Sequence, residues 1–190
     1  MKIAIALPAA AMSRPELAAK SAAVPALSVV VAVACDGWRR ACAAAPNLAE
    51  VAAVAAFEDA AGEAELPPGV RVVVGLTLAD DAEQCRLNHT WRGKDTSTNV
   101  LAFPVAGPER PPPGAPLLLG DVVLALETVA AEAAAQNKPL ADHLRHLVVH
   151  GVLHLLGQDH EDPDQAEAME RREAAILARL GVPDPYRDII

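Results

Sequence analysis

The sequence predicts a single compact α/β (α+β) domain, in which helices pack on a mixed sheet of about four strands. Three observations lead to this class. The chain has 190 residues, a length that suits one domain better than two. Short runs of branched aliphatic residues alternate along it with longer amphipathic stretches. Hydrophobic residues make up 52% of the chain and aromatic residues only 3%, so we expect a core of aliphatic side chains.

Four short apolar runs are typical of buried strands, because β-branched residues are frequent in them and turn-forming residues flank them. They cover residues 27–34, 70–78, 98–103 and 117–124. Residues 104–116 hold six prolines, which lack the backbone N–H that a helix interior or a central strand needs. We therefore expect a surface loop between the third and fourth strands.

Apolar residues recur at helical intervals in the stretches between and after these strands. Helices are expected from Trp38 onward and over residues 46–60, 79–88, 127–136, 140–156 and 163–180. Gly157 and Gly181 follow the last two patterns, at the position where glycine commonly ends a helix. This order of strands and helices favours one mixed sheet covered by helices.

Residues 1–26 are expected to form a poorly ordered N-terminal extension, and residues 27–190 the folded domain. Lys2 and the apolar residues after it also outline a short secretory signal. Pro8 interrupts that apolar run, which is only weakly hydrophobic, so we favour the extension. No apolar run approaches the roughly 20 residues of a membrane-spanning helix, and we expect no membrane partner.

The formal net charge of −9 disfavours a protein that coats nucleic acid in general, because such a protein needs a broad basic face. A small local basic patch remains compatible with this charge. The three cysteines, Cys35, Cys42 and Cys85, form no CxxC pair. This argues against a disulfide framework and a cysteine zinc site, and favours a reducing compartment.

Four histidines lie within fifteen residues: His146, His150, His154 and His160. Residues four apart on a helix project from the same face, so His150 and His154 can direct their imidazoles at one ion. Gly157 ends the helix and lets the chain fold back. His160 can then supply a third nitrogen from the following loop.

Three imidazoles leave a fourth coordination position for water, which is typical of a catalytic zinc site. Zn²⁺ is the expected ion, one per chain, although such a site also accepts Ni²⁺ and other divalent ions. The alternative triplet that starts at His146 fails, because its outer members are about 12 Å apart along a straight helix. We expect His146 beside a ligand or facing the substrate. His143 and His89 are expected to be ordinary helix histidines paired with backbone or carboxylate groups.

The helix 140–156 is expected to be a zincin-like metal-binding helix, but Gly151 occupies the place where the metalloprotease HExxH motif has its general-base glutamate. An ordinary zinc protease is therefore disfavoured. A bound metal alone can lower the pKa of water to about 7. Proton transfer could then fall to Asp159, Glu161 or His146, and an alternative role for Asp159 is to orient a ligand histidine.

A second group of polar and cationic side chains lies in residues 87–95, just before the third predicted strand. Arg92 offers a planar fork that suits phosphate oxygens, and Lys94 adds a point charge. Both are candidate substrate-binding residues. The alternative is a solvated loop with an Arg–Asp ion pair.

Four co-linear motifs resemble the bacterial YbeY family: RGKDTSTNVLAFP, LLLGDVVL, QNKPL and HGVLHLLGQDH. The similarity runs from about Leu27 to Tyr186. It implies a compact α/β domain, a zinc-type ion held by His150, His154 and His160, and Arg92 facing the metal cleft. The sequence departs from the family at Gln158, where a tyrosine is expected, and Trp91 is an aromatic substitute before Arg92.

The resemblance implies a metal-dependent endoribonuclease of rRNA maturation, acting in 16S rRNA 3′-end processing and ribosome quality control. Small-subunit ribosomal proteins and an assembly GTPase would be its partners, in the cytoplasm. The leading hypothesis is cleavage of single-stranded RNA, in which Arg92 neutralises charge that develops on the phosphate. The alternative is a non-catalytic ribosome-assembly factor with a structural metal site. A metal-dependent hydrolase of small molecules or peptides is a weaker third hypothesis.

Overall fold

The computed structural model describes residues 25–105, 111–112, 114–159 and 162–187. Its sheet is formed by β1 (Leu27–Val33), β2 (Val72–Ala79), β3 (Val100–Pro104) and β4 (Leu117–Ala125). The strand order is β1-β2-β4-β3, with β1, β2 and β4 parallel and β3 antiparallel to β4. The predicted mixed sheet of four strands is confirmed, and β3 is its edge strand next to the site described below.

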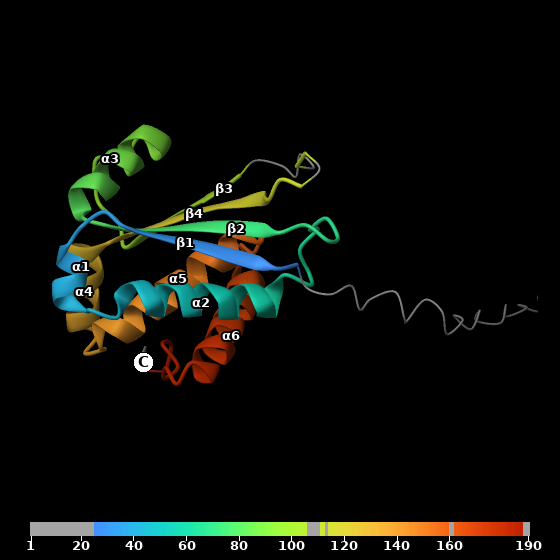
Figure 1. Cartoon of the computed structure of the whole chain (residues 1–190). Helices are drawn as coiled ribbons and strands as arrows, with labels where there is room; N and C mark the ends of the chain where they lie inside the picture. Colours follow the sequence, from blue (N-terminus) through green and yellow to red (C-terminus); the bar gives the residue numbers. More distant parts are fainter. Residues whose placement is uncertain (1–24, 106–110, 113, 160–161, 188–190) are drawn as a thin grey trace, which may run out of the picture.

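The helices are α1 (Gly37–Ala41), α2 (Ala45–Ala60), α3 (Asp81–Arg92), α4 (Leu126–Ala135), α5 (Leu140–Leu155) and α6 (Pro163–Arg179). Figure 1 shows α2, α5 and α6 on one side of the sheet and α3 on the other. Each helix expected from the sequence is present. The α/β fold class is therefore confirmed.

The core lies between the sheet and the helices α2 and α5. The face of α2 that packs here is a row of buried alanines: Ala45, Ala49, Ala52, Ala53, Ala56 and Ala60. Such small side chains let two helices approach closely, and α2 packs against α5. Leu144, Val148 and Val152 of α5 are fully buried in return. The face of α5 that bears His150 and His154 is thus carried by a helix packed into the core.

The helix α3 ends four residues later than expected, at Arg92 rather than at residue 88. Gly93 adopts the left-handed conformation with a φ of 66°, and its N–H donates to the carbonyl of His89. The sequence pattern does not predict this last helical turn, because the stretch is mostly polar and shows no apolar periodicity. As a result, Arg92 is an exposed residue at the end of a helix and not part of the loop that follows.

Residues 1–24 lie outside the described part of the chain, so the N-terminal extension stays a prediction. None of the helices that the structure describes is long and apolar enough to cross a bilayer. Cys35, Cys42 and Cys85 are all free thiols, as the absence of paired spacings predicts.

Candidate metal centre

The central feature of the site is a pair of imidazoles on α5. The Nε2 atoms of His150 and His154 lie 3.1 Å apart, and the two rings meet edge to face with their centroids 4.5 Å apart. The spacing of four residues places both rings on one helix face, because successive turns bring such residues into line. Both Nε2 atoms can therefore face a single ion.

Hydrogen bonds determine which nitrogen of each ring carries the proton. Nδ1 of His154 lies 2.9 Å from the carbonyl oxygen of Gln158, and a carbonyl can only accept, so Nδ1 donates. Nδ1 of His150 lies 2.8 Å from a carboxylate oxygen of Glu173 and donates in the same way. In the neutral rings both Nε2 atoms then carry lone pairs that face each other. A cation bound between them would be coordinated by both lone pairs, which is the arrangement expected of metal ligands.

Glu173 of α6 is a buried carboxylate, 1% exposed, that sits behind the histidine pair. It accepts hydrogen bonds from Nδ1 of His150 and Nε2 of His146, both at 2.8 Å, and from the hydroxyl of Tyr186. Burial alone would raise the pKa of Glu173, but the hydrogen bonds from His146 and His150 hold the pKa lower, at about 2. The carboxylate is therefore charged and holds the His150 ring in one orientation.

Sequence analysis missed Glu173, although the pattern of α6 contains a signal for it. Met169, Ile176 and Leu177 form the buried face of this helix, and Glu173 falls among them. A charged residue on an apolar helix face is seldom buried without a partner. Its partners come from another helix, which the pattern of α6 alone cannot reveal.

The donor set fits a zinc-type ion, because two imidazole nitrogens converge and each ring is held by a hydrogen bond at its other nitrogen. The third predicted ligand, His160, lies outside the described residues. Within the described part of the chain no group of three His, Cys, Asp or Glu residues could hold an ion. The three-histidine site therefore stays a prediction, with two of its members brought together.

Gly151 has a packing reason to replace the HExxH glutamate. A Cβ atom at this position would lie 2.6 Å from Cγ1 of Val122 in β4 and 3.5 Å from a methyl of Val100 in β3. Only glycine allows α5 to approach the sheet this closely. The site therefore lacks a glutamate base at this position, where the Val122 side chain leaves no room for a larger residue.

A cavity of about 520 Å³ opens beside the histidine pair. Its lining residues are Arg92, Asn99, Val100, Ala102, Pro104, His150, Gly151, His154, Gly157, Gln158 and Asp159. The cavity thus lies between the end of α3, the edge strand β3 and the C-terminal half of α5. Arg92 and Asp159, two predicted site residues, share it with the histidine pair.

The turn after α5 keeps Asp159 near His154. Gly157 has a φ of 86°, and the Gln158 N–H donates to the carbonyl of Leu153 over 3.0 Å. This is the hydrogen-bond pattern of a helix that ends at a left-handed glycine. The chain therefore turns back beside the helix, and the Gln158 carbonyl can bind the His154 ring.

Two other predicted residues do not line the cavity. Nε2 of His146 is 2.8 Å from Glu173 and 3.1 Å from the Tyr186 hydroxyl oxygen, so this ring faces the buried carboxylate. Lys94 is exposed just beyond the end of α3. Neither Arg92 nor Lys94 forms an ion pair with any residue that the structure describes.

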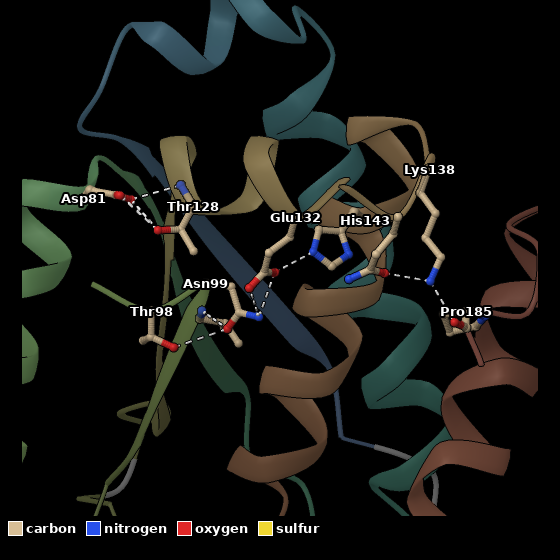
Figure 2. Close-up of polar contacts among 10 residues, drawn as sticks. Asp81, Thr98, Asn99, Thr128, Glu132, Lys138, His143 and Pro185 are labelled. Carbon is tan, nitrogen blue, oxygen red and sulfur yellow. Dashed lines mark hydrogen bonds and ion pairs between the residues drawn. The ribbon is translucent and has the colours of Figure 1, made fainter. Parts of the chain in front are cut away.

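The remaining two histidines are paired with carboxylates, as expected for ordinary helix residues. His143 is hydrogen-bonded through Nε2 to Glu132 at 2.8 Å, and His89 is 2.6 Å from Asp95. Burial lowers the pKa of His143. Figure 2 shows that Glu132 also accepts from the side-chain amide of Asn99, 3.0 Å away. Asn99 lines the cavity, so this network braces the cavity wall, a role that sequence analysis missed.

Fold and site together define a compact α+β protein in which two converging histidines and an arginine line one cavity. The sequence model described as Endoribonuclease YbeY matches residues 44–181 of this chain. The chain is 52% identical over 163 residues to the endoribonuclease YbeY of Paramagnetospirillum magneticum, with 84% of this chain and 96% of the relative covered. It is 50% identical over 161 residues to that of Azorhizobium caulinodans, with the same 84% and 96% covered.

The chain therefore belongs to the endoribonuclease YbeY family, as the motif resemblance implies. Among solved structures, the solution structure of TM1509 from Thermotoga maritima matches with a TM-score of 0.50 and 21% identity. The match covers 81% of this chain and 92% of the other. At this identity the likeness concerns the fold alone.

Proposed function

We propose that this chain is a hydrolytic endoribonuclease that acts in rRNA processing and cuts single-stranded RNA with the help of a divalent metal ion. The observation that carries the proposal is the pair of Nε2 atoms 3.1 Å apart at a cavity that Arg92 also lines. Relatives at about half sequence identity, named as endoribonucleases, support the same activity.

We assign the metal to His150, His154 and His160, with Zn²⁺ as the first candidate and Ni²⁺ as another. A bound ion of this type supplies Lewis-acid activation of a water molecule and of a phosphoryl oxygen. Glu173 and the Gln158 carbonyl keep the rings of His150 and His154 turned toward the ion. His146 acts through Glu173, because its ring contacts that carboxylate and does not line the cavity.

Arg92 is assigned to the phosphate. Its guanidinium donates hydrogen bonds in a fork that matches two phosphate oxygens, and it neutralises charge that builds up on them in the transition state. Such a cation stands out in a chain with a net charge of −9. Lys94 lies two residues after Arg92 and adds positive charge for the part of the RNA strand outside the cavity. Asp159 lines the cavity and either moves a proton or orients a ligand.

Cleavage of single strands fits the shape of the site. The cavity lies between a helix end, a strand edge and a turn. The backbone of the RNA must therefore be splayed to bring a phosphate to it. We place this activity in the cytoplasm, with rRNA precursors as substrates and with small-subunit ribosomal proteins and an assembly GTPase as partners.

Two substitutions test the proposal. His154→Ala is expected to lose both bound metal and RNA cleavage, because it removes one of the converging nitrogens. Arg92→Glu is expected to retain the metal and lose cleavage, because it places a negative charge against the phosphate. Metal content is measured by elemental analysis of the purified proteins, and cleavage with a single-stranded RNA substrate.

The matched control is His89→Ala, which removes an exposed helix histidine that pairs with Asp95 and does not line the cavity. It is expected to keep metal and cleavage. Full cleavage by metal-free His154→Ala protein would overturn the proposed mechanism. If the wild type cuts no RNA with any divalent metal but sediments with the small ribosomal subunit, the assembly-factor alternative replaces it.

A further inference from the structure

Trp91 is the most exposed large hydrophobic residue in the described part of the chain, with 70% of its surface accessible. The other tryptophan, Trp38, is fully buried, and its indole N–H donates to the carbonyl of Ala79. An indole is among the largest apolar surfaces a side chain can bury. Its exposure therefore calls for a reason other than packing.

The ring is held on rigid structure. Trp91 lies in the last turn of α3, which is ended by Gly93, and its ring centroid is 6.0 Å from that of Phe103 in β3. Asn88 of the same helix donates to the carbonyl of Thr96 over 2.7 Å, which ties the following loop to α3. The indole is therefore carried by a regular helix end that is tied to the loop before β3.

That place adjoins the RNA site. Arg92, the next residue, lines the cavity, and so do Ala102 and Pro104 on either side of Phe103. Because side chains alternate along a strand, Phe103 faces the opposite side of β3 from the cavity. β3 is the edge strand, so it is the one strand of the sheet between Trp91 and the cavity.

We propose that Trp91 is a stacking platform for an unpaired nucleobase that flanks the phosphate bound at Arg92. The RNA strand would pass over the edge of β3, with its sugar–phosphate backbone beside Arg92 and Lys94 and one base on the indole. Aromatic side chains beside basic groups are the usual means of binding single-stranded nucleic acid without sequence preference. A duplex keeps its bases stacked internally, so this contact would favour single strands. The inference rests on the proposed function and deepens it.

The two tryptophans allow a direct test by fluorescence. A short single-stranded oligoribonucleotide is titrated into the metal-loaded full-length protein. Each incubation is too brief for the RNA to be cleaved. Stacking is expected to quench the indole emission. Trp91→Phe should abolish this quenching, because the remaining Trp38 is buried and out of reach. An abasic oligonucleotide of the same length should cause no quenching.

Affinity gives the second measurement. Trp91→Ala is expected to weaken binding of the oligoribonucleotide about tenfold, the size of one base–aromatic stacking contact, while Trp91→Phe retains most of it. Val30→Ala is the matched control, because Val30 is also exposed but lies on β1 at the far edge of the sheet. It should leave affinity unchanged.

The outcomes separate the two proposals. If the wild type binds and cuts RNA, but Trp91→Ala binds equally well and the emission does not change, stacking on Trp91 is wrong and the endoribonuclease proposal stands. If the wild type neither binds nor cuts RNA, both are wrong. Quenching by purified small-subunit ribosomal proteins and not by RNA would assign Trp91 to a protein contact and overturn the stacking proposal.

Discussion

At the scale of single residues, Glu173 orients one member of the histidine pair, His150, without lining the cavity. One of its oxygens fixes the proton of His150 on Nδ1, and the other binds His146 and Tyr186. A carboxylate in this position makes the opposite nitrogen a better metal ligand and holds its direction. Metal affinity should therefore depend on a residue that does not touch the ion.

Glu173→Gln is expected to lower metal affinity by about 10- to 100-fold, because the amide presents only one acceptor to three donors. The measurement is a competition titration against a metal chelator. Glu170→Gln on the exposed face of the same helix is the control and should leave affinity unchanged. Equal metal affinity in wild type and Glu173→Gln would show that the carboxylate has no such role.

The sequence predicts the ligand candidates better than the residues that position them. His150 and His154 follow from helical periodicity alone, because both lie on one helix. Glu173 is 23 residues from its partner His150 and lies on a different helix. Periodicity describes one element at a time, so contacts between two elements need the tertiary structure.

At the scale of elements, the close approach of α5 to the sheet depends on Gly151. The sequence shows only that a glutamate is missing there, whereas the structure shows that Val122 fills the space. The bounds of α3 illustrate the same limit. Its last turn is polar and gives no apolar pattern. In the structure the helix continues to Arg92 and ends at the left-handed Gly93.

Gly151→Ala is expected to lower the free energy of unfolding by about 1–3 kcal/mol, although alanine favours helix more than glycine does. The added methyl would meet a buried, β-branched side chain that cannot move aside easily. Urea denaturation measures the change. Gly62→Ala is the control, because a Cβ there meets nothing within 4 Å. A stabilised Gly151→Ala protein would show that α5 can shift away from the sheet at little cost.

At the scale of the whole molecule, the site brings together segments that are far apart in sequence. Arg92 comes from α3, Asn99 precedes β3, the histidine pair belongs to α5, and Glu173 belongs to α6. The motif resemblance implies that Arg92 faces the cleft of the histidines, but sequence analysis assigned no role to Asn99 or Glu173. A metal bound where these segments meet should stabilise the entire fold, because the unfolded chain cannot hold the ligands together.

Metal binding is therefore expected to raise the thermal unfolding midpoint. At a free Zn²⁺ concentration about 100 times the dissociation constant, binding contributes about 2.7 kcal/mol to the free energy of unfolding. For a chain of this size that corresponds to a rise of roughly 5–10 °C, which a chelator should reverse. Differential scanning calorimetry of the metal-free and metal-loaded protein measures the shift. His154→Ala should show almost no rise, whereas His89→Ala should respond like the wild type. An equal rise in His154→Ala would place the stabilising ion somewhere other than the histidine pair.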